Sequence, residues 1–140
     1  RYINDFMPLH MFDLLKDGLK EVGKKLDEVN ILVLGYAYDA NSDDDRNTPT
    51  VPLIEKLKEN KVKFEIHDPF IKDYKGDVKE MLKGKDAIVL MTGHDEYKEL
   101  EYKEIAKLMN KKPLIIDGRN IFDKEDARKN GFVYKGVGNI

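Results

Sequence analysis

The stretch Ile31-Leu32-Val33-Leu34-Gly35 is an apolar run that contains no polar residue and ends on a glycine. A strand with one face in water alternates apolar and polar side chains, whereas a continuous apolar run suits a strand that is buried on both faces. Strands of this kind belong to parallel sheets that helices cover on both sides. The run therefore predicts the central strand of an α/β domain.

The chain after this run alternates between strand and helix patterns. Thr48 is the predicted N-cap of one helix and Asp123 of another, and the alternation in 62–66 predicts a less buried strand than the first. This order predicts an α/β fold, a doubly wound, mostly parallel, Rossmann-like sheet. The further strands are expected at 62–66, 87–91, 114–116 and 132–134, with helices at 49–60, 78–83, 102–110 and between Asp123 and Gly131.

A long amphipathic helix is predicted ahead of the sheet, from Asp5 to Glu28, with Pro8 in its first turn. In its N-terminal half, Met7, Met11 and Leu14 lie off the main apolar stripe, so two flanks of the helix are apolar. One core cannot cover both flanks, and we expect a partner there, with a homodimer formed through this helix. The predicted division is 1–29 for the helix and 30–140 for the sheet domain.

Composition excludes several classes of function. The 140 residues suffice for one compact domain, and 25 basic against 27 acidic residues leave no positive field for nucleic acid. The sequence has no cysteine, so it holds no disulfide, thiolate zinc site or cysteine nucleophile, and no apolar stretch is long enough for a membrane span. No export signal is visible, and because the chain begins at Arg1, we expect it to be cut from a longer protein.

Polar residues follow every predicted strand except the last, at the sheet edge where α/β proteins bind ligands. The first turn, Gly35 to Ala40, lacks the G-x-G-x-x-G fingerprint, so it is a poor main site for NAD. Asp68 either binds a ribose or serves the turn before Pro69, and the turn is at least as good an explanation. Asp43 to Asp45 favour a solvated loop over a cation site, and the three histidines have no metal-ligand spacing, so no metal and no catalytic triad are predicted.

Two arginines follow strand ends, where a guanidinium offers a forked pair of donors to phosphate or carboxylate. Arg119 lies in the sequence Asp117-Gly118-Arg119-Asn120, and either contacts a ligand, which we favour, or pairs with Asp117. Arg46 either contacts a ligand or pairs with Asp43 or Asp44.

Motif-like stretches follow one another along nearly the whole chain: Val33–Tyr38, Asp43–Pro49, His67–Pro69, Asp86–Thr92 with His94–Tyr97, Ile116–Asn120 and Gly131–Gly138. In this order they resemble the C-terminal domain of the UDP-glucose/GDP-mannose dehydrogenase family. The segment Asn4-Asp5 with Met7-Pro8 and His10 is also similar to the central helix of the branch that acts on UDP-N-acetyl-D-mannosamine.

This resemblance implies a cytoplasmic oxidoreductase of polysaccharide biosynthesis that converts a sugar C6 alcohol to a carboxylate with two NAD, through a thioester on a cysteine. The glycine-rich NAD domain and that cysteine would precede Arg1, so this chain alone would be inactive and would carry the UDP-sugar-binding part. By the same resemblance, Arg119 holds the nucleotide-sugar, Tyr38 packs at the nucleotide and Arg46 reaches the NAD.

The resemblance also places His10 on a helix used for dimerisation, near a substrate of the partner subunit. One position departs from the family pattern, because Asp39 stands where the family usually has a lysine, which reverses a charge near the expected diphosphate. Two other interpretations stay open. The chain is either a free-standing nucleotide or nucleotide-sugar binding module, or chiefly a dimerisation element built on its first helix.

Overall fold

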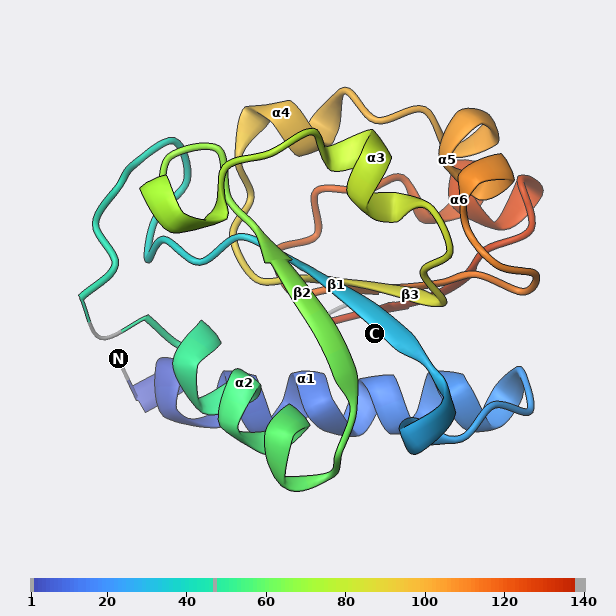
Figure 1. The fold of residues 1–140 in the computed structure, drawn as a ribbon, viewed down its shortest axis with the longest axis horizontal. Coiled ribbons are helices and arrows are strands. Elements are labelled where there is room, and N and C mark those ends of the chain that lie inside the picture. The colour runs from blue at the N-terminus through green and yellow to red at the C-terminus, as the bar shows by residue number, and fades with distance from the viewer. Residues whose placement is uncertain (1, 47, 138–140) are drawn as a thin grey trace.

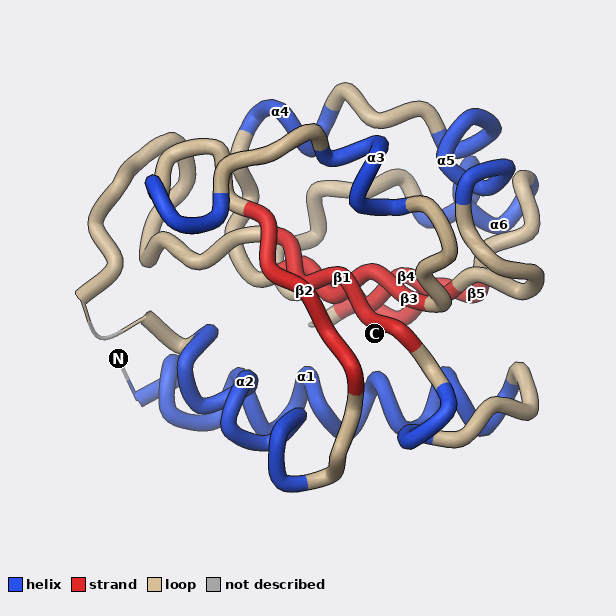
Figure 2. Tube along the Cα trace, viewed as in Figure 1, coloured by secondary structure: helices blue, strands red, loops and turns tan. Residues whose placement is uncertain are grey.

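The computed structural model describes residues 2–46 and 48–137, with the side chains of residues 2–7 left out. Five parallel strands form one sheet in the order β2-β1-β3-β4-β5. This is the doubly wound α/β fold that the strand and helix patterns predict, and Figures 1 and 2 show the sheet between two layers of helices. The strands are β1 (Asn30–Leu34), β2 (Lys63–His67), β3 (Ala87–Leu90), β4 (Leu114–Asp117) and β5 (Val133–Gly136).

The α-helices of the described residues lie on both faces of the sheet, the longer ones on one face and the shorter ones on the other (Figure 1). The short helix α4 (Asp95–Lys98) has no counterpart in the sequence prediction, because its four residues are too few for a helical repeat to show. On one face lie α1 (Tyr2–Glu21) and α2 (Thr50–Glu59), and on the other α3 (Val78–Leu82), α4 (Asp95–Lys98), α5 (Tyr102–Leu108) and α6 (Lys124–Lys129).

The predicted central strand is buried on both faces, as expected. Ile31 and Val33 belong to the core beneath α1 and α2, whereas Leu32 and Leu34 belong to the core beneath α3, α5 and α6. The edge strand β2 alternates between exposed and half-buried residues until His67, which confirms that it is less buried than β1. Both outcomes follow from the two-residue period of side chains along a strand.

The first helix ends at Glu21, seven residues before the predicted end. The N–H of Gly23 donates to the carbonyl of Lys20 and the N–H of Lys24 to the carbonyl of Leu19, which together form a Schellman cap. Gly23 has a φ of 73°, which glycine adopts without strain, so the chain turns there. The predicted start is also too late, since α1 begins at Tyr2 and Pro8 lies inside it rather than in its first turn.

The second apolar flank expected on α1 is packed inside this chain. Met11 is completely buried in the core beneath α1, and Leu14 packs against the same core. The side chain of Met7 lies outside the described residues, and Leu9 is an apolar side chain of this helix that is 47% exposed. The structure therefore removes most of the apolar surface on which we based the expected dimer.

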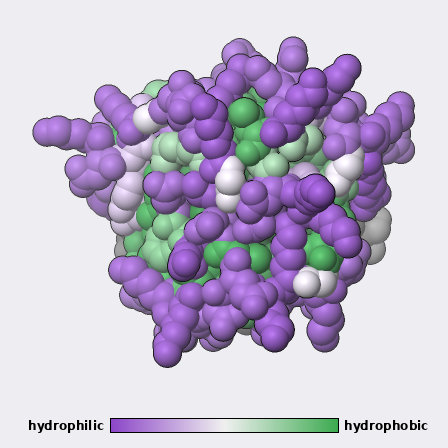
Figure 3. Space-filling view, turned by 45° about the vertical axis from the view of Figure 1, so that its right-hand side comes forward, coloured by the Kyte–Doolittle hydropathy of each residue, from purple (hydrophilic) through white to green (hydrophobic). Residues whose placement is uncertain are grey.

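Among the described helices, none is long and apolar enough to cross a membrane. The face in Figure 3 is mostly hydrophilic, with small hydrophobic areas separated by polar and charged side chains.

Candidate functional site

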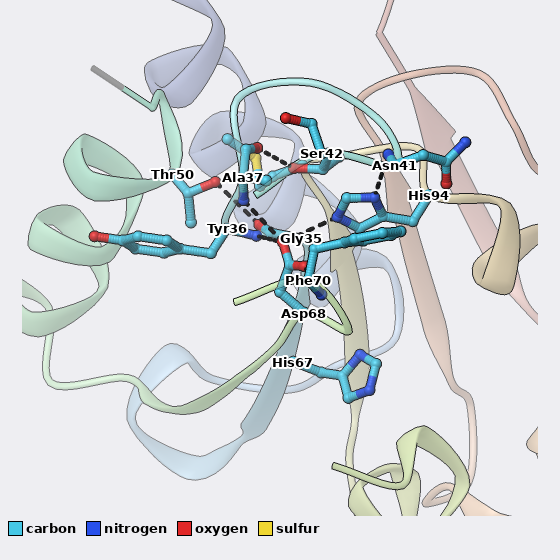
Figure 4. Close-up of polar contacts among 12 residues, drawn as sticks. Gly35, Tyr36, Ala37, Asn41, Ser42, Thr50, His67, Asp68, Phe70 and His94 are labelled. Atoms are coloured by element: carbon cyan, nitrogen blue, oxygen red, sulfur yellow. Dashed lines mark hydrogen bonds and ion pairs between the residues drawn. The ribbon is translucent and has the colours of Figure 1, made fainter. Parts of the chain in front are cut away.

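The candidate site lies at the carboxyl ends of the strands, where strand order reverses between β1 and β3. In doubly wound sheets this point leaves a crevice in which ligands bind. The loop from Gly35 to Pro49 runs across it before α2 begins, and Figure 4 shows how residues from β2 and β3 approach the first part of this loop.

Gly35 fixes the close approach of two loops at this point. Its φ is 100°, and a Cβ there would lie 2.4 Å from Cβ of Thr92, so no larger residue fits without displacing the chain. The Thr92 hydroxyl donates to the carbonyl of Ala37 at 2.6 Å, and the Thr50 hydroxyl donates to the carbonyl of Gly35 at 3.1 Å. The start of the loop is thus tied both to β3 and to α2.

Asp68, directly after β2, is a buried carboxylate that collects N–H donors from the loop. Its Oδ2 accepts the backbone N–H groups of Tyr36 at 2.7 Å and Ala37 at 2.8 Å, and its Oδ1 accepts that of Phe70 at 2.8 Å. Burial by itself would raise the pKa of Asp68, but these bonds and one from His94 outweigh it and hold the pKa below the ordinary value. Asp68 is therefore a carboxylate at neutral pH.

His94, after β3, completes this cluster. Its Nε2 lies 3.0 Å from Oδ2 of Asp68, and its Nδ1 accepts the backbone N–H of Asn41 at 2.7 Å. Because a nitrogen that accepts a hydrogen bond carries no proton, the imidazole is neutral and its single N–H donates to Asp68. The ring of Phe70 covers it, with the ring centroids 4.9 Å apart, and His94 is completely buried (Figure 4).

The Asp68 contacts also test whether this turn fits a dinucleotide. In a dinucleotide-binding turn, the backbone N–H groups after the first strand face the pyrophosphate. Here the N–H groups of Tyr36 and Ala37 are bonded to the Asp68 carboxylate, and α2 begins only at Thr50. The residues of this turn therefore do not fit NAD. Of the two explanations for Asp68, a role in the turn before Pro69 is confirmed.

Arg119 lies over the same edge from the end of β4. Its Nε donates to the carbonyl of Met91 at 3.0 Å and its Nη2 to the carbonyl of Tyr38 at 3.3 Å. These are its side-chain bonds among the described residues, and they leave three of the five guanidinium N–H groups for a ligand. The residue is exposed, so those donors face solvent at the edge of the site.

The sequence left open an ion pair between the side chains of Asp117 and Arg119. In the structure, Asp117 instead accepts hydrogen bonds from the backbone of the turn. Its Oδ1 accepts the backbone N–H of Arg119 at 3.0 Å, and its Oδ2 accepts the N–H of Phe122 at 2.9 Å and the hydroxyl of Tyr134 at 2.7 Å. Burial raises the pKa of Tyr134, and the bond to Asp117 raises it further. The carboxylate thus fixes the backbone that carries Arg119.

Arg46 is paired with Asp44, as the sequence allowed. Its Nε and Nη2 each lie 3.0 Å from one carboxylate oxygen of Asp44, which is a forked arrangement, and the Arg46 side chain is 85% exposed. Hydrogen bonding to Arg46 lowers the pKa of Asp44 to about 2. The pair lies farther along the loop after β1, on the C-terminal side of the residues that are bonded to Asp68 and His94.

The remaining predicted site residues are less closely tied to this cluster. Tyr38 is half-buried within the loop, and its backbone N–H donates to the carbonyl of Asp44 at 2.6 Å. His10 is exposed in the N-terminal half of α1, the half on the same side of the molecule as the loop after β1 (Figure 1). Within the described residues, no three His, Asp or Glu side chains come together to hold a metal ion.

Sequence reasoning placed Asp68 and His94 at strand ends but did not pair them. The signal was present in the strand order, because β2 and β3 are both neighbours of β1. Polar residues that directly follow two such strands converge above the end of the strand between them, and a buried Asp and His there are expected to bond to each other.

Comparison with known proteins agrees with this geometry. The sequence model described as "UDP-glucose/GDP-mannose dehydrogenase family, UDP binding domain" matches residues 32–124, more than half of the chain. That match includes the loops after β1, β2, β3 and β4, which form the candidate site. The chain belongs to the UDP-glucose/GDP-mannose dehydrogenase family.

Individual relatives give the same family. UDP-N-acetyl-D-mannosamine dehydrogenase of Pyrococcus horikoshii is 35% identical over 99% of this chain and 32% of its own length. UDP-glucose 6-dehydrogenase of Rickettsia conorii is 36% identical over 78% of this chain and 28% of its own length. A crystal structure of NDP-N-acetyl-D-galactosaminuronic acid dehydrogenase from Methanosarcina mazei superposes with a TM-score of 0.92 and 38% identity, over 99% of this chain and 30% of that one. The chain thus spans about a third of the length of the relatives it matches.

Proposed function

We propose that this chain binds a UDP-sugar at the carboxyl edge of its sheet, as the substrate-binding part of an NAD-dependent UDP-sugar 6-dehydrogenase. The substrate we propose is UDP-N-acetyl-D-mannosamine, oxidised to the uronate in two NAD-dependent steps. Relatives named for N-acetylated hexosamines support the sugar class, and the family match over the strand-end loops supports the place of binding.

The position of Arg119 carries this proposal. Its guanidinium is anchored on the carbonyls of Met91 and Tyr38, which belong to the two loops that flank the switch point. An anchored guanidinium whose other N–H groups face solvent is preorganised for a diphosphate, because little side-chain freedom remains to be lost on binding. Arg119 donates to the carbonyl of Tyr38, the residue before Asp39, so it is our candidate to offset that acidic residue.

The parts of the proposal that concern the whole enzyme rest on the family alone. We propose that NAD is held mainly by residues outside this chain, with Arg46 reaching it after leaving Asp44, and that the cysteine nucleophile also lies outside. Tyr38 and His10 remain proposed substrate contacts, and a homodimer through α1 remains a proposal. This chain alone, given a UDP-sugar and NAD, is expected to form no NADH.

Arg119→Ala tests the proposal by titration calorimetry with a UDP-sugar. Loss of a hydrogen bond to a charged group costs about 1.5–3 kcal/mol, a tenfold to hundredfold rise in Kd. Arg128→Ala is the matched control, since Arg128 also donates to a backbone carbonyl, that of Tyr134, but lies on α6 away from the loop after β1. Equal affinity of wild type and both variants would remove Arg119 from the site.

The alternative is a free-standing nucleotide or nucleotide-sugar binding module. Equal affinity for UDP and a UDP-sugar favours a module that binds the nucleotide alone, whereas a preference for the UDP-sugar fits both the enzyme part and a nucleotide-sugar module. Sequencing upstream of Arg1 decides more directly, because a glycine fingerprint and a cysteine there support the enzyme.

A further inference from the structure

The first part of the loop after β1 is held by side chains from its two neighbouring strands. Its near end, at Tyr36 and Ala37, is bonded to Asp68 after β2, and its far end, at Asn41, is bonded to His94 after β3. Asp68 and His94 are bonded to each other, so one buried pair contacts both ends of the segment 36–41 (Figure 4). Each end has one further bond, from the Thr92 hydroxyl to the Ala37 carbonyl and from the Asp95 N–H to the Asn41 side chain. Tyr38, whose carbonyl holds Arg119, lies between the two ends.

The bond at the far end requires a neutral His94. Its Nδ1 is the acceptor for Asn41, and a proton on Nδ1 would set one N–H donor against another across 2.7 Å. The bond from Nε2 to Asp68 needs no such change, because that nitrogen already carries a proton. Protonation therefore breaks the bond from the Asn41 N–H, while the Asn41 side chain still accepts the Asp95 N–H and the near end stays bonded to Asp68.

The groups that face His94 come from three parts of the chain. Asp68 is the carboxylate from the β2 side, and the ring of Phe70 lies over the imidazole. Tyr97 of α4 has its ring 5.7 Å away and stays neutral, since burial raises its pKa far above the ordinary value. Next along the chain the exposed carboxylates of Asp95 and Glu96 begin α4, and the Asp95 N–H donates to the Asn41 side chain.

We propose that His94 is a positioning residue whose neutral form keeps the segment 36–41, and with it the Tyr38 carbonyl and Arg119, in the conformation that binds the UDP-sugar. Affinity falls as His94 gains a proton. This inference rests on the proposed function for its ligand, but the state of the Asn41 bond is independent of any ligand.

Two variants separate the two contacts of the imidazole. His94→Asn places a carbonyl oxygen near the position of Nδ1, where it accepts the Asn41 N–H without titrating. His94→Gln places an N–H donor near the position of Nε2, facing Asp68, and leaves Asn41 without its acceptor. Each of these two variants thus keeps one of the two bonds of the imidazole. Neither new side chain changes its charge between about pH 5 and 8, the range in which an imidazole does.

The first measurement is the Kd of a UDP-sugar, which has no terminal phosphate to titrate, between about pH 8 and 5. Wild-type affinity is expected to fall with acid, at most about tenfold per pH unit because a single proton is involved. His94→Asn is expected to bind as wild type does at pH 8 with no such fall, and His94→Gln more weakly at every pH. If His94 is merely structural, both variants will have a lower melting temperature and both will keep the acid dependence of affinity that wild type shows. That result would overturn the proposal.

The second measurement needs no ligand. The hydrogen-exchange protection factor of the Asn41 amide is expected to drop with acid in wild type and to stay constant in His94→Asn. The Tyr38 amide, bonded to the carbonyl of Asp44, is the internal control and should not change. If no UDP-sugar binds at any pH, the proposed function fails, and exchange still decides the inference about the loop. Constant protection of Asn41 in wild type overturns the inference.

Discussion

Two buried aspartates stand at opposite edges of the sheet and are held in different ways. Asp68, at the carboxyl edge, accepts three backbone N–H groups and the neutral ring of His94. Asp86, at the amino edge just before β3, accepts one backbone N–H, from Asn30, together with the side chains of Lys24 and Asn110, each at about 3 Å. For both, burial alone would raise the pKa, but hydrogen bonds outweigh it and hold the pKa below the ordinary value.

The two clusters hold different parts of the chain through different partners. Lys24 also donates to the carbonyl of Lys111 at 2.6 Å, so the Asp86 cluster fastens the chain after α1 to the loop before β4. Its side-chain partners are an amine and an amide, which keep their charge state near neutral pH. The Asp68 cluster fastens the loop after β1 through a carboxylate and an imidazole, a group whose charge in general changes near neutral pH. If a proton on His94 loosens that loop, as we propose above, the Asp86 cluster is expected to stay unchanged.

The largest effect is expected from Asp68→Ala. The change removes the acceptor of three backbone N–H groups and of the His94 ring, and the bonds to Ala37 and His94 are fully buried. Each buried donor left without an acceptor costs about 1–3 kcal/mol of the free energy of unfolding, which urea denaturation measures. Asp68→Asn keeps one acceptor oxygen and should cost less. Equal stability of Asp68→Ala and wild type would contradict the network described for this edge.

A smaller effect is expected from Asp86→Ala, about 1–3 kcal/mol in the same assay. Here the Lys24 side chain is 21% exposed and Asn110 is exposed, so both donors turn to water when the carboxylate is gone. Affinity for a UDP-sugar should remain at the wild-type value, since the cluster is at the far edge. A loss of affinity as large as that of Arg119→Ala would mean that the two edges are coupled.

The smallest effect is an acid dependence shared by the two edges. Because the folded-state pKa values of Asp68 and Asp86 are lowered, their stabilisation is complete above the unfolded value of about 3.9 and is lost as the pH falls below it. The urea midpoint should therefore be steady above that value and decline below it. Asp86→Asn should decline less steeply than wild type, and an identical slope would assign the whole dependence to other groups.

Short sequence patterns, such as apolar runs and helix-capping residues, predicted the fold well, because each depends on interactions between residues that are close in the sequence. The apolar run from Ile31 to Leu34 has to be buried on both sides, and Asp123 caps α6 with its side chain as predicted. The predicted end of α1 was wrong because apolar spacing continued through Val22 and Leu26, while Gly23 ended the helix. The burial of Met11 was also misjudged, since helical spacing does not show which other elements pack beside α1.

The sequence alone predicted the doubly wound sheet, the edge at which we expect a ligand and the family to which the residues point, because burial periodicity and strand-end motifs are local properties. Only the tertiary structure decided that Asp68 occupies the backbone N–H groups of the first turn and that His94 binds both Asp68 and Asn41. These partners are 26 to 53 positions apart in the chain, and they meet only because β2 and β3 flank β1.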